Sequence, residues 1–153
     1  MLLYLVQHAE AKSEKEDPQR PLTDKGKEEV TRVANYLKVC KVKIDKIFHS
    51  GKLRAKQTAE IFAEHLGVSQ IEEKEGLSPL DEPSKAKDLI EKSKENLMIV
   101  GHLPHLSRLT SALIAKDASF EIVKFTMGGV LCLIKTDDEW KINWMITPEV
   151  AKI

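Results

Sequence analysis

Met1-Leu-Leu-Tyr-Leu-Val-Gln-His-Ala-Glu-Ala11 contains a short, unbroken apolar run that ends abruptly at polar residues. The run, Leu2 to Val6, is typical of a strand that lies inside a parallel sheet and is covered on both faces. Ligands of open α/β sheets bind beyond the carboxyl ends of the strands, so we expect a rigid element to hold His8 at such a place. A lone histidine at a strand end is more often a packed polar residue than a reactive one. The interpretation of His8 as a reactive centre therefore depends on residues further along the chain.

The composition is that of a globular protein with one domain, which we predict to span residues 1–153. Hydrophobic residues make up 42% of the chain and charged residues 31%, and the length is enough for a sizeable core. Lys+Arg and Asp+Glu both number 24, so the chain as a whole has no attraction for nucleic acid or anionic lipid. No apolar run is long enough to span a bilayer, and the N-terminal run lacks the features of a signal peptide. These features predict a cytoplasmic protein that binds neither nucleic acid nor membranes.

The cysteines and most of the histidines form no recognisable metal-binding pattern. Cys40 and Cys132 are far apart and lack CxxC spacing, so we expect both to be buried, reduced thiols. His49, His65 and His105 add no zinc motif, and we expect no metal or other cofactor. We expect His49 to pack at a strand end and His105 to lie on a helix surface.

Strands and helices alternate along most of the chain. Apolar runs predict strands over residues 2–6, 43–49, 68–73 and 97–101, and helical periodicity predicts helices over residues 24–38, 53–66, 85–94 and 104–115. The first helix begins at an N-cap, Thr23 or Asp24, and Gly67 ends the second. Two alternating segments, 130–135 and 140–146, predict a C-terminal β-hairpin. This order predicts an α/β fold, a three-layer α/β/α sandwich with a mostly parallel central sheet.

Three groups of polar residues stand directly after predicted strands. They are Gln7-His8, Ser50-Gly-Lys-Leu-Arg54 and Gly101-His102. All three converge on one crevice if their strands are neighbours in the sheet. Two imidazoles and a guanidinium that meet at helix N-termini make a site for a tetrahedral dianion. Such a charge is local, which agrees with a net charge of zero.

The residues of this site suit phosphoryl transfer. Neutral imidazole is nucleophilic near pH 7, because its unperturbed pKa is about 6.5. It can accept a phosphoryl group and so divide one difficult displacement into two easier ones. Arg54 would bind the equatorial oxygens in bidentate fashion. His102, if protonated, would do the same from the other side.

Four stretches of the chain together resemble the histidine phosphatase superfamily, and in particular its small SixA-type branch of phosphohistidine phosphatases. They occur in the family's order over residues 2 to about 147, and the resemblance implies a phosphoglycerate-mutase-like fold. The stretches are Leu5-Val-Gln-His-Ala9, Arg20-Pro-Leu-Thr-Asp-Lys-Gly26, Ser50-Gly-Lys-Leu-Arg-Ala-Lys-Gln-Thr-Ala59 and Val100-Gly-His-Leu-Pro104.

The resemblance also implies roles for individual residues. His8 would be the phospho-accepting nucleophile, and Arg54 and His102 would be phosphate-pocket residues. Arg20 is similar to a basic residue that this branch brings to the pocket rim, although it could equally be a solvated loop arginine. Ser50 would contribute either a hydroxyl or a tight turn beside the phosphate, and turn geometry alone is the simpler interpretation.

The sequence departs from the family pattern in two places. Gln7 replaces the arginine of the usual Arg-His-Gly opening, so one phosphate contact loses its charge. The segment that carries a carboxylic acid in larger family members offers only Asp81 and Glu82, which read as solvated turn acids. A missing acid is chemically reasonable for phosphohistidine, whose P–N bond is labile and whose imidazole leaves more readily than an alcohol.

The leading hypothesis is therefore a phosphatase that removes the phosphoryl group from phosphohistidine in a partner protein, for which a phosphorelay or phosphotransfer domain is one candidate. A covalent phosphohistidine on His8 would be the intermediate, and free phosphate would be a further ligand. One alternative is a phosphatase for small phosphoesters or other phosphoproteins. Another is a phosphate-recognition module with weak turnover, because Gln7 stands where the family has arginine.

The position of Gln7 yields a first prediction. A Gln7→Arg variant should bind phosphate more tightly than the wild type, because a charge-assisted hydrogen bond is roughly twice as strong as a neutral one. Calorimetric titration with orthophosphate measures this affinity. An unchanged or weaker affinity would mean that Gln7 does not occupy the assigned place in the pocket.

Overall fold

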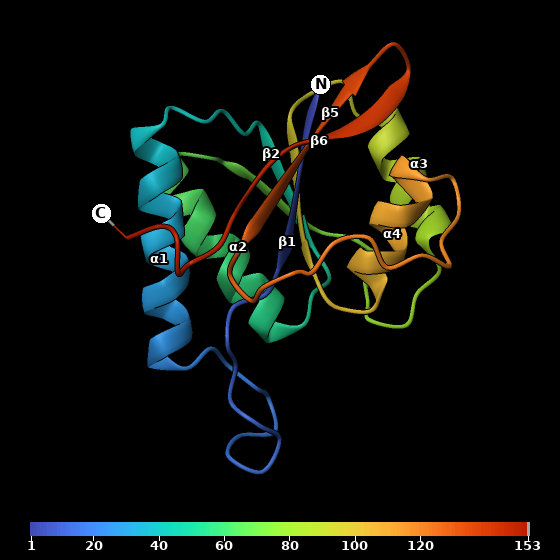
Figure 1. Cartoon of the computed structure of the whole chain (residues 1–153). Coiled ribbons are helices and arrows are strands. Elements are labelled where there is room, and N and C mark those ends of the chain that lie inside the picture. The colour runs from blue at the N-terminus through green and yellow to red at the C-terminus, as the bar shows by residue number, and fades with distance from the viewer. Residues whose placement is uncertain (153) are drawn as a thin grey trace.

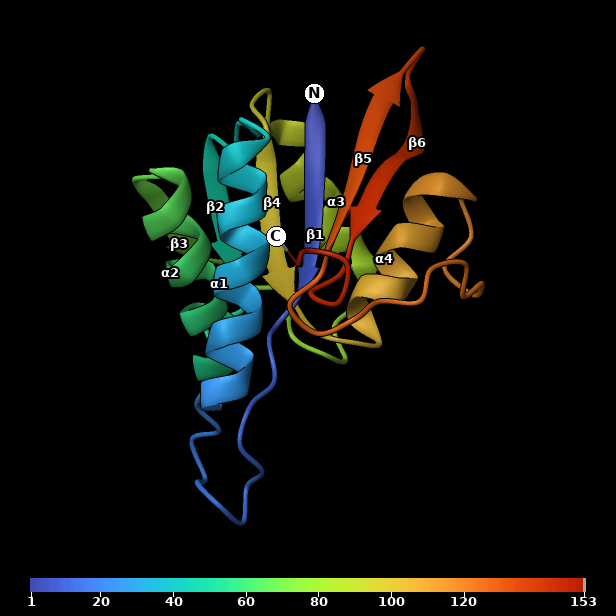
Figure 2. The same cartoon turned by 60° about the vertical axis from the view of Figure 1, so that its left-hand side comes forward.

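A six-stranded sheet runs through the molecule, with α1 and α2 packed on one face and α3 and α4 on the other (Figures 1 and 2). The computed structural model describes residues 1–152, so the predicted domain 1–153 includes one residue, Ile153, outside the described part. The strands are β1 Leu2–Gln7, β2 Lys46–His49, β3 Gln70–Glu73, β4 Leu97–Gly101, β5 Val130–Thr136 and β6 Glu139–Ile146. The helices are α1 Asp24–Val39, α2 Leu53–Leu66, α3 Pro83–Lys92 and α4 His105–Ile114. The predicted three-layer α/β/α sandwich is confirmed.

The strand order is β3-β2-β4-β1-β5-β6, and the first four strands are mutually parallel. β5 pairs antiparallel to β1, and β5 and β6 form the predicted antiparallel hairpin. β4 lies between β1 and β2, with Val100 opposite both Val6 and His49. The carboxyl ends of these three strands therefore lie side by side, at the place where ligands of open α/β sheets bind.

The first strand is buried on both faces, which explains its unbroken apolar run. Tyr4 and Val6 belong to the core that α1 and α2 cover, whereas Leu3 and Leu5 belong to the core beneath α3 and α4. Side chains that alternate between two covered faces must all be apolar. The buried strand thus fixes the position of the residues that directly follow it, His8 among them.

The start of α1 fastens the loop that leaves β1. Thr23 is the N-cap, and its hydroxyl accepts a hydrogen bond from the backbone N–H of Gly26 at 3.0 Å. The N–H of Thr23 donates to the carbonyl of Glu10 at 3.0 Å. A Cβ on Gly26 would lie 2.2 Å from that same carbonyl oxygen, so only glycine allows this close approach. Gly26 therefore allows α1 to pack closely against the loop after β1, rather than against the sheet.

Several predicted boundaries shift, each for a local reason. Residues 43–45 are not part of β2, and Asp45 is instead held by a backbone bond of 2.9 Å to Asn96. α3 begins at Pro83 rather than at Lys85, because proline suits the first position of a helix. Pro104 is the N-cap of α4 and not part of its first turn.

Two further properties concern the surface of the molecule. Cys132 is buried as expected, but Cys40 is exposed, because it follows the last turn of α1 at the edge of the molecule. In residues 1–152, no helix combines the length and the apolar character needed to cross a membrane.

Candidate active site

The parallel pairing of β1 with β4 brings His8 and His102 together. Gln7 lies opposite Gly101 in the register, and the backbone N–H of His8 donates to the carbonyl of Gly101 at 3.0 Å. The two imidazole rings are 5.1 Å apart between centroids, with their planes at 53°. Two histidines that are 94 positions apart in the sequence are therefore neighbours at the carboxyl ends of adjacent strands, the convergence expected if these strands pair.

The imidazole of His8 is held in one orientation by a backbone carbonyl. Its Nδ1 lies 2.7 Å from the carbonyl oxygen of Ala9, which can only accept, so Nδ1 carries the proton. The N–H of Ala9 donates to the hydroxyl of Thr58 at 3.0 Å, and that hydroxyl donates to the carbonyl of Arg54 at 2.8 Å. In the neutral ring, Nε2 therefore keeps its lone pair. A hydrogen-bonded chain ties this ring to the first turn of α2.

His8 stays neutral at physiological pH. Burial lowers its pKa to about 4, and the charges of Arg54 and Arg20 act in the same direction. The hydrogen bond to Ala9 opposes this shift, but burial outweighs it. A neutral ring with a free Nε2 lone pair is the form that an imidazole nucleophile requires.

His102 is neutral for a similar reason. Burial lowers its pKa to about 3, and His8, Arg54 and Lys52 add to the shift. Its Nε2 lies 2.6 Å from the hydroxyl oxygen of Ser50. The protonated His102 considered from the sequence is therefore not the form present without a bound anion. A dianion in the pocket would favour the protonated ring.

Ser50 contributes more than a turn. Its hydroxyl oxygen, besides its contact with His102, accepts a hydrogen bond from the N–H of Lys52 at 3.3 Å. The hydroxyl thus joins the end of β2 to the residue that follows β4. Gly51 makes the turn itself, with a φ of 90° that glycine adopts readily. Turn geometry alone is an incomplete description of this segment.

Two arginines supply the positive charge. Arg54 lies in the first turn of α2, and its buried Nε makes no hydrogen bond to any residue of the described part. Burial lowers the pKa of Arg54, and the charge of Arg20 adds to this effect. The Nε of Arg20 donates to the carbonyl of Lys12 at 2.9 Å, and the charge of Arg20 contributes to the lowered pKa of both His8 and Arg54. This placement favours the pocket rim over a freely solvated loop.

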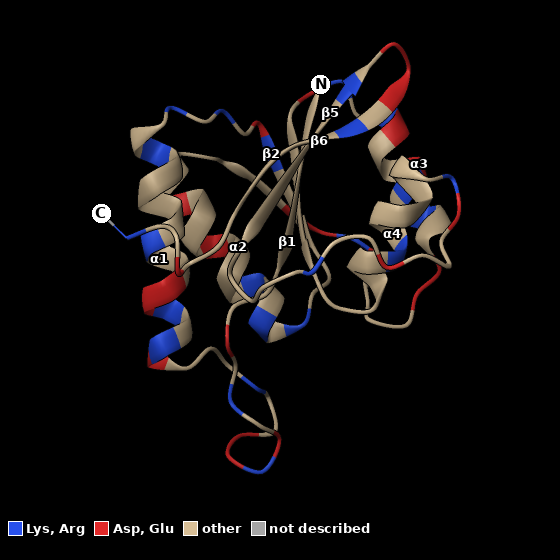
Figure 3. Ribbon diagram, in the orientation of Figure 1, with Lys and Arg blue, Asp and Glu red and all other residues tan. Residues whose placement is uncertain are grey.

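The N-terminus of α2 strengthens the attraction for an anion. α2 has no acidic residue in its first turn and no side chain that caps its free N–H groups. Figure 3 shows basic residues at this end of α2. The positive end of a helix dipole together with free backbone N–H groups favours a bound anion. The positive charge near His8 is thus a local feature of a chain whose net charge is zero.

Three other predicted residues lie at the margin of the site. Gln7 ends β1, its side chain is half-buried, and its carbonyl accepts from the N–H of Gly128 at 2.9 Å. Asp81 accepts a hydrogen bond from the backbone N–H of Ser78 at 2.9 Å, and Glu82 forms an ion pair of 3.0 Å with Arg108. Both acids thus serve local structure. In the described chain, no carboxylate is hydrogen-bonded or ion-paired to either histidine of the pocket.

His105 was expected on a helix surface, and this expectation is wrong. The side chain is fully buried, and burial lowers its pKa while Asp81 opposes the shift. It lies on the inward face of α4, because the face repeats every four residues through Leu109 and Leu113, which are also buried. That spacing is the sequence signal that would have placed His105 in the core.

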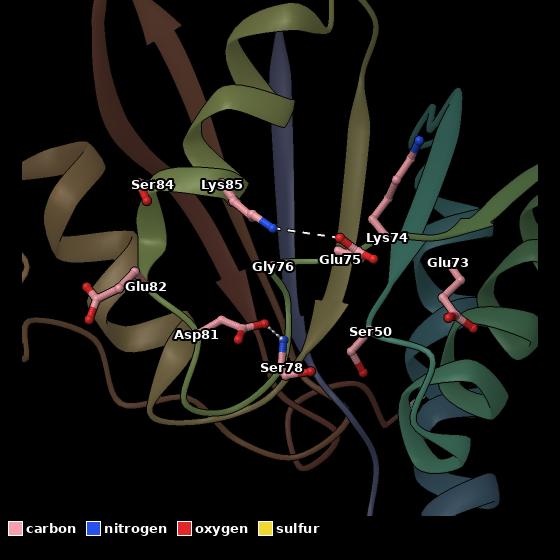
Figure 4. A pocket seen from close by; sticks show the side chains of 10 residues that line it. All are labelled: Ser50, Glu73, Lys74, Glu75, Gly76, Ser78, Asp81, Glu82, Ser84 and Lys85. Carbon is pink, nitrogen blue, oxygen red and sulfur yellow. Dashed lines mark hydrogen bonds and ion pairs between the residues drawn. The ribbon is translucent and has the colours of Figure 1, made fainter.

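A polar recess of about 470 Å³ opens beside Ser50, which forms part of its wall (Figure 4). Across from Ser50 lie Ser78 and Asp81, and Lys85 forms an ion pair of 3.7 Å with Glu75. The recess reaches the pair of histidines through Ser50 alone, whose hydroxyl oxygen contacts His102. Nowhere in residues 1–152 do three or more His, Cys, Asp or Glu side chains form a group suited to a metal ion.

Fold and site together define a class of protein: an α/β protein with a neutral, oriented histidine in an anion pocket, equipped for phosphoryl transfer. The sequence model of the histidine phosphatase superfamily (branch 1) matches residues 3–81. The chain therefore belongs to this superfamily.

Individual relatives agree with the membership. The chain is 26% identical to the phosphohistidine phosphatase SixA of Escherichia coli (strain K12), over 97% of this chain and 94% of that protein. A solved structure of the protein histidine phosphatase SixA complexed with tungstate has 26% identity and a TM-score of 0.85, covering 99% of this chain and 100% of that one. The alpha-ribazole phosphatase of Shigella flexneri shares the fold, with a TM-score of 0.76 at 16% identity over 97% of each chain. The predicted likeness to the SixA-type branch is confirmed, and the relationship supports a phosphatase.

The shifted histidines yield a prediction about stability. In the unfolded chain an imidazole takes up a proton below about pH 6.5, whereas His102 in the folded protein stays neutral down to about pH 3. The unfolded state therefore binds more protons across this window, and stability falls as the pH falls. Between pH 7 and 4.5, wild type should lose on the order of 2 kcal/mol more than a His102→Asn variant in urea unfolding. Parallel losses for the two proteins would contradict a neutral, buried His102.

Proposed function

We propose that the protein removes the phosphoryl group from phosphohistidine in a partner protein, with His8 as the covalent acceptor. The observation that carries this proposal is the bond of 2.7 Å from His8 Nδ1 to the Ala9 carbonyl, which leaves Nε2 as the nucleophile. The likeness to SixA over 97% of the chain supports the substrate class. Tungstate, named with the solved SixA structure, is a tetrahedral oxyanion of the same shape as phosphate.

In the first step, Nε2 of His8 attacks the phosphorus and the P–N bond of the substrate breaks. A phosphohistidine protonated on its other ring nitrogen leaves as neutral imidazole, while His8 becomes the phosphorylated, protonated ring. One P–N bond replaces another, so protons and charges balance. Arg54 and His102 hold the phosphoryl oxygens, where charge develops in the transition state.

In the second step, a water molecule attacks the phosphorus on His8. The bond from Nε2 to phosphorus breaks, and His8 returns to its neutral form with the proton on Nδ1. The product is dihydrogen phosphate, which balances the step in atoms and charge. The carbonyl of Ala9 accepts the same hydrogen bond throughout, so the ring does not have to turn between the two steps.

The absence of a bonded carboxylate favours phosphohistidine over phosphoesters. An alkoxide leaving group needs a proton donor, and both candidate acids in the described part are engaged elsewhere: Asp81 with Ser78 and Glu82 with Arg108. Imidazole leaves without such help. A phosphorelay or phosphotransfer domain is the kind of partner that carries this group.

We further propose that residues 1–153 form one catalytic domain and that it acts in the cytoplasm. The cysteines Cys40 and Cys132 are unpaired, which suits a reducing compartment. A catalytically weak phosphate-recognition module is the second candidate, and the observation that favours it is Gln7 at the pocket, where the family has arginine.

Trapping of the phosphorylated protein with an alkaline quench tests the proposal. Wild type mixed with a phosphohistidine protein should release phosphate and itself carry a phosphoryl label that is base-stable and acid-labile. His8→Ala should abolish both signals, and Arg54→Ala should slow release about 10²–10³-fold through the lost charge. His65→Ala, a histidine change on the outer part of α2, is the matched control and should behave as wild type.

The outcomes separate the candidates. A label that persists in His8→Ala would exclude His8 as the acceptor. Faster turnover of a panel of sugar phosphates than of the phosphohistidine protein would favour the small-phosphoester alternative. Phosphate binding without any label or release would favour the recognition module.

A further inference from the structure

Large apolar side chains are exposed on the loops beside the phosphate pocket. The β3–α3 loop exposes Leu80, the β4–α4 loop exposes Leu103, and the α4–β5 loop exposes Phe120, Ile122 and Met127. The β3–α3 and β4–α4 loops lie at the end of the sheet where β1 and β4 finish, and the α4–β5 loop reaches that end shortly before β5 (Figure 1). Exposed apolar side chains that gather around a polar site are typical of a surface that contacts another molecule.

Two of these side chains border the pocket at His102. Leu103 follows His102 directly in the sequence. Phe120 and Leu103 line the same shallow groove, of about 220 Å³, beside the start of α4. The groove therefore begins one residue after His102.

A third apolar side chain borders the pocket at the end of β1. Met127 directly precedes Gly128, whose N–H donates to the carbonyl of Gln7 at 2.9 Å. A Cβ on Gly128 would lie 3.8 Å from the Cβ of Ala9, so the loop passes against the residue that follows His8. We refer to Leu103, Phe120 and Met127 as the apolar rim.

The α4–β5 loop, which carries Phe120 and Met127, is fixed to the rest of the protein. Val123 and Phe125 are buried in the core beneath α3 and α4, between the exposed Phe120 and Met127. The carbonyl of Phe120 accepts a hydrogen bond from the hydroxyl of Ser111. The backbone on which Phe120 sits is thus fixed while its side chain faces solvent.

We propose that the apolar rim is the surface on which the phosphorylated protein docks, through apolar side chains that adjoin its phosphohistidine. This inference rests on the proposed function. The charges of Arg54 and Arg20 complement the phosphoryl dianion and fix its position at His8. Because Leu103 follows His102 and the segment after Met127 contacts Gln7 and Ala9, a protein whose phosphoryl group reaches His8 comes close to the rim. A small phosphorylated compound would leave most of the rim in water and gain nothing from it.

The test compares a rim variant with a matched control. The rim variant is Phe120→Ser/Met127→Gln, whose side chains are 54% and 40% exposed. The control is Ile142→Ser/Met145→Gln on β6, whose side chains are 51% and 37% exposed. Both are assayed on a phosphohistidine protein and on phosphoramidate, and thermal unfolding verifies that each folds.

The rim variant should lose about tenfold or more in kcat/KM on the phosphoprotein, as truncation of central interface residues typically does. Its kcat/KM on phosphoramidate should stay within about twofold of wild type, and the control should match wild type on both substrates. The selective loss on the protein substrate is the signature of docking.

Equal activity of wild type and rim variant on the phosphoprotein overturns the inference and leaves the proposed function intact. A wild type that forms dimers, with a rim variant that is monomeric and fully active on the phosphoprotein, assigns the rim to a second copy of this chain and also overturns it. A wild type that hydrolyses neither substrate overturns the proposed function and this inference with it.

Discussion

The parallel pairing of β1 with β4 is the interaction on which the rest of the site depends. It places Gln7 beside Gly101, so His8 and His102 leave neighbouring strands at the same height and their rings meet at 5.1 Å. Burial of β1 on both faces holds this register, because a slip by one residue would move every side chain to the opposite face. The sheet holds the strands rigidly, and the residues directly after the strand ends form the candidate site.

Burial and positive charge act together in the pocket. Desolvation keeps both histidines neutral; the charge of Arg54 lowers both histidine pKa values further, and that of Arg20 lowers the pKa of His8. The same arginines, with the N-terminus of α2, favour a bound anion beside the neutral His8. The oriented, neutral ring and the positive charge next to it therefore come from one arrangement, in which Ala9 orients the ring and Arg54 supplies charge.

Much of this could be predicted from the sequence, because it depends on local patterns. The apolar runs of β1 and β4, the N-cap at Thr23 and the αL cap at Gly67 are all found where expected. The convergence of three polar groups followed from their places after strands. The contact between the Ser50 hydroxyl and His102 could not be predicted, because it depends on the distance between two loops. The same holds for the approach of Gly26 to Glu10, which joins a helix to a loop.

The protonation state of His8 tests the central claim most directly. Long-range ¹H–¹⁵N correlation spectra of ¹⁵N-histidine-labelled protein, assigned with a His8→Asn variant, report the charge and the tautomer of each ring. At pH 7 the account predicts a neutral His8 with its proton on Nδ1, which becomes protonated only as the pH falls towards about 4. A protonated ring at pH 7, or a neutral ring with its proton on Nε2, would contradict it.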